Sequence, residues 1–291
     1  MALCAVSGVG VVGLGPFFVE PRWDNGGMNV SPLVHALAID CSTDRLSLAL
    51  AVGPLPLPGA DAWGDCQCLV FEGEGSAKAS TSLVPEALRL IQQAGLEPSD
   101  LSAIVYGRGP GAFTGLRTAC AAAQGLAFGA NDRPVIGVDT LMAVAQEARL
   151  QGAPAGPITV LMDARMNEIY TGTYRLSNAL FPESVPHVCS APSLLAPAHV
   201  SAAVRAWHTD APQVAGNAMA VYPEALNGLD TQASIWSVAP TARAMLHVLP
   251  ALWAAGAATP PDEAIPVYVR DQVALTTAER EALRAGANPV A

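Results

Sequence analysis

The 291-residue chain is poor in positive charge, in aromatic residues and in histidine. It carries 15 Lys and Arg against 25 Asp and Glu, which gives a formal net charge of −10, and it has 5 histidines. Affinity for nucleic acid comes largely from many Lys and Arg contacts to phosphates. We therefore expect that this chain does not hold RNA or DNA strongly by itself, and that a partner does so if its pathway involves RNA.

The sequence also lacks the residue patterns of common catalytic and metal sites. No two histidines lie three to five residues apart, the spacing that places two metal ligands on one helix face. There is no Ser-x-x-Lys, Gly-x-Ser-x-Gly or His-Glu-x-x-His motif. We therefore predict no catalytic residue and no metal ligand, and a metallopeptidase of the glycoprotease type is the weakest functional alternative.

The six cysteines indicate no disulfide framework. Cys66 and Cys68 stand close together without a matching second pair, and the others are scattered, several of them within apolar runs. This pattern favours structural thiols over a metal site.

The first 19 residues carry no charge, so a signal or membrane segment has to be considered. A basic start is missing, and several glycines and Pro16 weaken a spanning helix. Met28 shortly precedes the first clear strand pattern. We interpret residues 1–32 as a disordered or artefactual leader, and we expect a cytoplasmic protein without membrane contact.

The stretch from Ala103 to Ala130 dominates the rest of the sequence. It reads as a buried strand, a turn with three glycines, and a helix made mostly of small residues. Thr114 is the predicted N-cap of that helix. Helix N-termini bind anions, whereas a helix apolar on all sides is buried against other helices. The stretch can therefore be a phosphate cradle or a packing surface.

The two halves of the chain begin alike. Leu33–Ile39 reads as a strand that ends at Asp40, followed by a polar turn and a second strand. Ile158–Met162 repeats this pattern with Asp163. We infer two related lobes, residues 33–151 and 157–275, with a cleft between them that both aspartates face. The tail, residues 276–291, is expected to be mobile.

Small and polar residues at the strand ends and in the glycine turn are the candidates for a nucleotide phosphate. They are Asp40, Ser42, Thr43, Gly109, Gly111, Thr114, Gly115 and Asp163. The alternative is ordinary turn chemistry, because Asp, Ser, Thr and Gly favour turns in any protein.

Further helices are predicted at Thr81–Ala94, at Leu141–Arg149 with Asp139 and Thr140 as its cap, and at Thr241–Ala255, where Pro250 should cause a kink. Val267–Arg270 is predicted as a last short strand.

Several segments together resemble the TsaB (YeaZ-like) family. They are Leu37–Asp40 with Ser42 and Thr43, Tyr106–Arg117, Gly125–Ala127, Ile136–Leu141, Met162–Arg165 with Glu168–Tyr170, and Pro266–Arg270. The resemblance covers about residues 35 to 275. It agrees with an α/β fold of two lobes in the actin, hexokinase and Hsp70 (ASKHA) superfamily, each lobe a mixed sheet flanked by helices.

The resemblance implies a non-catalytic subunit of the complex that transfers a threonylcarbamoyl group to N6 of adenosine 37 in ANN-decoding tRNAs. In that system TsaD carries out the transfer, TsaB is its heterodimer partner and scaffold, and TsaE is a small ATPase. The chain would then need no cofactor beyond weak nucleotide binding, since its partners use ATP. It would meet tRNA only through the complex, and we expect it to homodimerise when alone.

The resemblance further implies that the partner binds the first lobe through helices. The interface candidates are Leu83, Leu88, Ile91, Arg117, Ala119, Ala122, Ala123 and Leu126. The alternative is that these residues fill the core of their own lobe. Relatives often carry Arg-Glu-His before the first of these helices, whereas this chain has Ala77-Lys78-Ala79, so any role of that histidine is absent.

A different functional class stays open from the residues themselves. The chain can be an independent nucleotide-using enzyme, an ATPase or kinase of the actin-like class, with the phosphate candidates around its cleft.

Overall fold

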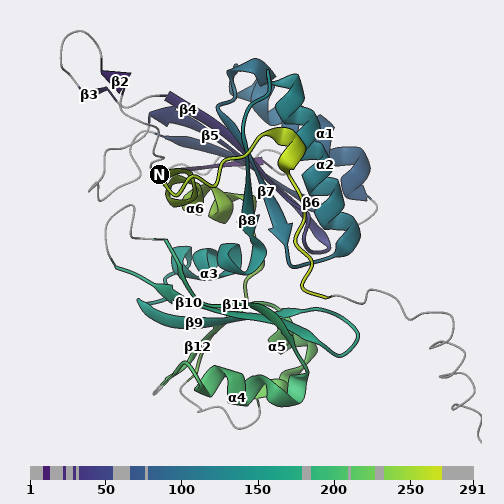
Figure 1. Cartoon of the computed structure of the whole chain (residues 1–291), viewed down its shortest axis with the longest axis vertical. Helices are drawn as coiled ribbons and strands as arrows, with labels where there is room; N and C mark the ends of the chain where they lie inside the picture. Colours follow the sequence, from purple (N-terminus) through teal and green to yellow (C-terminus); the bar gives the residue numbers. More distant parts are fainter. Residues whose placement is uncertain are drawn as a thin grey trace, which may run out of the picture.

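The structure is a computed structural model, and it describes residues 9–13, 22–23, 29–30, 33–54, 66–75, 78–178, 185–208, 211–226 and 233–270. These residues form two lobes, each built on one mixed β-sheet with helices on its faces (Figure 1). This is the predicted two-lobed α/β architecture. The predicted tail, residues 276–291, lies outside the described residues.

The first lobe contains a six-stranded sheet in the order β1-β6-β5-β4-β7-β8. Its strands are β1 (Val9–Gly13), β4 (Leu33–Asp40), β5 (Arg45–Pro54), β6 (Gln67–Glu74), β7 (Ala103–Gly109) and β8 (Val135–Asp139). β1, β6, β5 and β4 pair in antiparallel fashion, while β7 is parallel to both β4 and β8. Within the predicted leader, β1 thus joins the sheet edge, and β2 (Arg22–Trp23) pairs with β3 (Asn29–Val30).

Both faces of this sheet are covered by helices. Alternate strand residues point to opposite faces, so Leu37 and Ile39 pack toward α1 (Ala79–Gln93) and α2 (Phe113–Gly129). Ala36 and Ala38 pack toward α6 (Ala242–Ala254) instead. Figure 1 shows α1 and α2 together on one side of the sheet and α6 on the other.

The second lobe contains a five-stranded sheet in the order β11-β10-β9-β12-β13. Its strands are β9 (Gly156–Asp163), β10 (Ile169–Leu176), β11 (His187–Leu195), β12 (Gln213–Ala215) and β13 (Ser234–Trp236). The core on one face is shared with α3 (Thr140–Leu150), and that on the other with α4 (Val200–Arg205) and α5 (Ala218–Val221). Short 3₁₀ turns are η2 (Pro98–Asp100), η3 (Pro197–His199), η4 (Pro223–Leu226) and η5 (Pro261–Glu263).

Two helices cross between the lobes that the sequence divides at residues 151 and 157. α3 buries Leu141 and Val144 in the core of the second lobe. α6, from the second half of the chain, buries Met245 and Leu249 against the first sheet. The apolar stripe of a helix determines which face is buried, but not which sheet covers that face. By chain order α3 would belong to the first lobe and α6 to the second, but each packs in the core of the other lobe.

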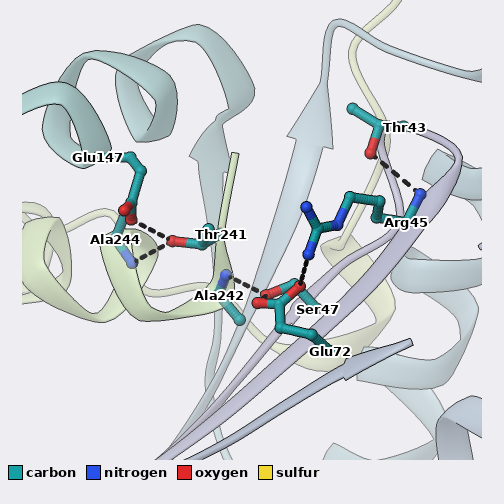
Figure 2. Close-up of polar contacts among 8 residues, drawn as sticks. All are labelled: Thr43, Arg45, Ser47, Glu72, Glu147, Thr241, Ala242 and Ala244. Carbon is teal, nitrogen blue, oxygen red and sulfur yellow. Dashed lines mark hydrogen bonds and ion pairs between the residues drawn. The ribbon is translucent and has the colours of Figure 1, made fainter. Parts of the chain in front are cut away.

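A chain of polar contacts fixes the N-terminus of α6 to the first sheet (Figure 2). The N–H of Ala242 donates to Ser47 Oγ at 2.8 Å, and Ser47 Oγ donates to Glu72 Oε1 at 2.7 Å. Burial raises the pKa of the Glu72 carboxyl, partly offset by the Ser47 hydroxyl. The helix start is thereby tied to β5 and β6.

The same helix start is bonded to α3 through Glu147, as Figure 2 shows. Thr241 Oγ1 donates to Glu147 Oε2 at 2.7 Å and accepts the N–H of Ala244 at 3.0 Å. Arg243 donates to Glu147 Oε1 at 2.9 Å. The buried Glu147 carboxylate is therefore paired and hydrogen-bonded, as a charge away from water requires.

The last described residues form an extended segment, residues 264–270, which we call the strap. It runs along α2, where Cys120 Sγ and Gln124 Nε2 both donate to Ala264 O. Val267 N donates to Arg108 O at 2.6 Å. Because this contact does not continue into a ladder, the predicted strand at Val267–Arg270 is wrong.

The predicted helix starts are partly correct. Asp139 caps α3, with its Oδ1 accepting the N–H groups of Leu141 and Met142. Thr114 is not the N-cap of α2, because the helix begins at Phe113 with Ala112 as its N-cap, two residues before Thr114, and no side chain caps it. None of the helices that the structure describes is long and apolar enough to cross a bilayer.

Candidate functional site

A pocket of about 750 Å³ opens between the two lobes. It is bounded by the β4–β5 turn, the N-terminus of α2, the β9–β10 turn and the strap. Six of the eight phosphate candidates line it: Ser42, Thr43, Gly111, Thr114, Gly115 and Asp163. The structure thus brings residues from both halves of the chain to one cleft.

Asp40 does not face this cleft, contrary to the expectation from its position at a strand end. It is 1% exposed, and its Oδ1 accepts the N–H and the hydroxyl of Ser42 at 3.2 and 2.9 Å. Its Oδ2 packs under Gly107, and no partner for it lies among the described residues. Burial raises the pKa of the Asp40 carboxyl to about 7. The carboxyl therefore holds the β4–β5 turn from inside the lobe.

Gly109 is also absent from the cleft wall. A Cβ at this position would collide with the carbonyl oxygen of Val267. The glycine therefore allows the strap to pass close to β7, which is a packing role that the sequence pattern alone did not indicate.

The glycines at the start of α2 serve a close approach of two backbone segments. A Cβ on Gly111 would lie 2.5 Å from Ser42 O, and one on Gly115 would collide with Cys41 O. Ala112 N donates to Ser42 O at 2.7 Å. Here only glycine lets the helix start rest on the β4–β5 turn. The glycine loop therefore lets the start of α2 pack tightly on this turn.

Asp163 lies on the cleft and organises the β9–β10 turn. Its Oδ1 accepts the N–H of Arg165 at 2.8 Å and the hydroxyl of Tyr222 at 2.9 Å. Its own N–H donates to Asn217 Oδ1 at 2.9 Å. Two groups of the protein therefore already donate to Oδ1 of this carboxylate.

The β9–β10 turn has an unusual backbone. Arg165, Met166 and Asn167 have φ values of 60°, 54° and 58°, a left-handed run that costs free energy for residues other than glycine. Arg270 of the strap supports the turn by donating to Ala164 O at 3.1 Å and pairing with the Glu168 carboxylate. The strap thus connects α2 in the first lobe to this turn in the second.

The cysteines are free thiols in the described part of the chain. Cys41, Cys66, Cys68 and Cys120 are buried and Cys189 is half-buried. Burial raises the pKa of the Cys66 thiol to about 11. Within the described ranges, no group of three His, Cys, Asp or Glu side chains is placed to hold a metal ion.

The interface candidates on α1 and α2 separate by burial. Five of them pack inside the first lobe, so for these the alternative of a core role holds: Leu83, Ile91, Ala119, Ala123 and Leu126. Ala122 is half-buried against the same core. Only Leu88, 42% exposed, and Arg117 are exposed. The Arg117 guanidinium lies over the Phe113 ring at 3.8 Å and donates to the Tyr268 hydroxyl.

A different set of small and apolar residues is exposed on these two helices. We call it the outer face; its members are Val84, Leu88, Ala121, Gly125 and Phe128. On each helix they are three or four residues apart, which places them on one side. The position of each residue around the helix axis could have separated the outer face from the buried candidates. That separation requires knowing which side of each helix packs on the sheet, which the sequence does not state.

The two lobes, the exchanged helices and the strand-turn-strand units on the cleft define an α/β protein of the ASKHA class. A family model described as "TsaD: tRNA N6-adenosine threonylcarbamoyltransferase" matches residues 74–232. The structure of YeaZ from Pseudomonas aeruginosa matches with a TM-score of 0.65 and 30% identity, over 81% of this chain and 99% of that one. A second structure, described as similar to peptidase YEAZ from Pseudomonas aeruginosa, gives a TM-score of 0.66 at 29% identity, over 81% and 100%.

Curated relatives agree with these matches. The tRNA threonylcarbamoyladenosine biosynthesis protein TsaB of Escherichia coli is 36% identical over 143 residues, 49% of this chain and 55% of the relative. The Haemophilus influenzae protein of the same name is 43% identical over 141 residues, 46% and 51%. The chain spans about half the length of these curated relatives. It belongs to the TsaB (YeaZ-like) family.

Proposed function

We propose that this chain is a non-catalytic subunit of the complex that transfers a threonylcarbamoyl group to N6 of adenosine 37 in ANN-decoding tRNAs. It binds the catalytic subunit TsaD as a heterodimer partner and scaffold, and TsaE joins the pair. The names of its relatives supply the pathway. The single observation that carries the scaffold role is the outer face of α1 and α2.

The outer face has the composition of a helix-packing surface. Val84 and Leu88 are 40% and 42% exposed on α1, and α1 contacts α2, which carries Ala121 and Gly125. A Cβ on Gly125 would meet no atom within 4 Å in the structure. Small residues beside exposed apolar ones let a second helix approach closely, and contiguous exposed apolar surface marks a binding site.

Two of the phosphate candidates support a structural role for this subunit. Asp40, enclosed in the first lobe, and Asp163, on the cleft, both accept hydrogen bonds that hold the turns next to them. We infer that this chain needs no cofactor of its own and that its partners use ATP. With a net charge of −10, it meets tRNA only within the complex, in the cytoplasm.

Charge introduced on the outer face tests the interface. Leu88→Glu and Ala121→Arg should each reduce co-purification with TsaD at least tenfold, because an unpaired charge would be buried in the contact. Val188→Glu, on a similarly exposed residue of β11 at 43%, should bind like the wild type. Circular dichroism checks that all variants fold. Wild-type binding by both outer-face variants would show that the partner docks elsewhere.

The second candidate function is an independent nucleotide-using enzyme, favoured by the cleft that collects Ser42, Thr43, Thr114 and Asp163. ATP turnover is measured for the protein alone and with TsaD and TsaE, together with tRNA modification. The scaffold role predicts no turnover alone and tRNA modification only with the partners. Robust ATP hydrolysis by the lone chain would favour the enzyme instead.

A further inference from the structure

A second groove, of about 630 Å³, opens where α2 ends. It lies between the last turn of α2 and the chain that leads into η5, and it is lined by Phe128, Asp132, Pro134 and residues 258–262. Figure 1 shows the yellow segment with η5 running beside α2, which it contacts. The groove is on the first lobe, away from the interlobe cleft.

The walls of this groove are apolar and offer few hydrogen-bond donors. Phe128 is 52% exposed, a large aromatic side chain left in contact with solvent. Pro134, Pro260 and Pro261 contribute ring surface and have no backbone N–H. Such a surface suits the aliphatic stem or the flat face of another side chain.

The charge of the groove has one sign. Asp132 and Asp262 are exposed at its edge, and neither side chain makes a hydrogen bond or ion pair within the described part of the chain. The C-terminal end of α2, which carries the negative end of the helix dipole, lies next to them. The lining residues include no Lys or Arg. An arginine or lysine side chain would complement this site, with Phe128 available for a cation–π contact.

The groove continues the outer face of α1 and α2. Phe128 follows Gly125 by three residues and Ala121 by seven, so the three share one side of α2. A partner laid along that side reaches the groove at its end. We propose that the TsaD subunit inserts a cationic side chain, arginine or lysine, between Asp132, Asp262 and Phe128. This inference rests on the proposed function, since it names the chemistry of that partner.

The test measures the Kd for TsaD by titration calorimetry at low and high salt. Asp132→Asn/Asp262→Asn removes the charges at nearly constant shape, and Asn tolerates the φ of 55° at residue 132. We expect a Kd roughly three- to tenfold weaker at low salt and a flatter salt dependence. Phe128→Ala should weaken binding about tenfold. The matched control, Asp44→Asn/Glu224→Gln, makes the same charge change at exposed residues outside the groove and should leave the salt dependence unchanged.

The outcomes distinguish the two proposals. Wild-type affinity and salt dependence in the groove variants, together with loss of binding in Leu88→Glu, would overturn the cationic contact and leave the scaffold role standing. An equal change in the control variant would also overturn it, because net charge would then explain the effect. No binding of TsaD by the wild-type chain would overturn both proposals.

Discussion

Single carboxylates show how burial decides what a residue does. Asp40 and Asp163 end equivalent strands and start equivalent turns, yet Asp163 lies on the cleft and Asp40 is enclosed under Gly107. Both accept a backbone N–H two residues ahead, so the turn chemistry is the same. The two aspartates differ in burial because different strands and helices pack against the two turns.

The enclosed carboxyl predicts a pH-dependent stability. Its folded pKa is about 7, against 3.8 without burial, so folding takes up a proton between these pH values. The free energy of unfolding should therefore fall as pH rises from about 4 to about 7 and stay level above. The contribution is about 4 kcal/mol at most, because one pKa unit corresponds to about 1.4 kcal/mol.

The variant Asp40→Asn isolates this effect. Asparagine keeps an oxygen for the Ser42 bonds but does not titrate, so the slope of stability against pH should be smaller than in the wild type. Urea unfolding across this pH range measures it. Ser42→Ala provides a second check. This variant loses a hydrogen bond that lowers the pKa of Asp40, so its stability should continue to fall with pH to a higher pH than in the wild type. Identical slopes in wild type and Asp40→Asn would contradict the assignment.

At the scale of elements, α6 depends on contacts that its own sequence does not contain. Its N-terminus is bonded to Ser47 from β5 and to Glu147 from α3 (Figure 2). These residues lie 195 and 94 positions away in the chain. The helix is therefore a joint between the two lobes as well as a cover for the first sheet.

Removal of one hydroxyl should weaken this joint measurably. Thr241→Ala loses the cap of Ala244 N and a bond to a buried carboxylate. We expect a loss of about 2–3 kcal/mol in the free energy of unfolding. Thr241→Ser keeps the hydroxyl and should lose less than about 1 kcal/mol. The midpoint of urea unfolding at unchanged m-value measures both, and equal stability of the two variants would rule out the capping role.

The outer face also belongs to this scale. The residue pattern predicted helices close to α1 and α2, and it predicted that small residues there would pack against something. It did not assign sides, because α2 is apolar nearly all round and has no unique buried face, and Leu83 and Leu88 of α1 are both apolar. Only contact with β4, β5 and β7 separates Leu83 and Ala119 from Leu88 and Ala121.

At the scale of the whole molecule, the strap joins the lobes across the cleft. It holds α2 through Cys120 and Gln124 and ends at Arg270 on the β9–β10 turn. The turn includes three residues with left-handed backbones, which an isolated hairpin would avoid. Its conformation therefore depends on residues about a hundred positions later in the chain.

Loss of this support should loosen the turn. Arg270→Ala removes the donors to Ala164 O and Arg165 O and the partner of Glu168. Amide hydrogen exchange of residues 164–168 should become about tenfold faster or more, because opening then costs at least about 1.4 kcal/mol less. Arg175→Ala, an exposed arginine on β10, is the matched control and should exchange like the wild type. Unchanged exchange in Arg270→Ala would show that the turn holds itself.

The sequence by itself determined the central strands of both sheets, such as β4, β7 and β9, and the turns that follow them. Apolar runs that end in Asp or Gly follow from local backbone and hydrogen-bond chemistry, which acts over a few residues. The same holds for helices capped by residues such as Asp139. The two-lobed α/β class and the family follow from the same local segments. Gly111 and Gly115 could be recognised as residues of a tight turn for this reason.

Only the tertiary structure decided which surfaces are inside. It placed α3 and α6 under each other's sheets, buried Asp40, laid the strap over Gly109 and left Val84, Leu88 and Phe128 exposed. Each of these outcomes depends on contacts between residues far apart in the chain, where burial of apolar area and desolvation of charge outweigh local preference. The local residue pattern determines whether a segment forms a helix or a strand and which of its sides is apolar. Packing of the whole chain determines which other helix or strand covers that side.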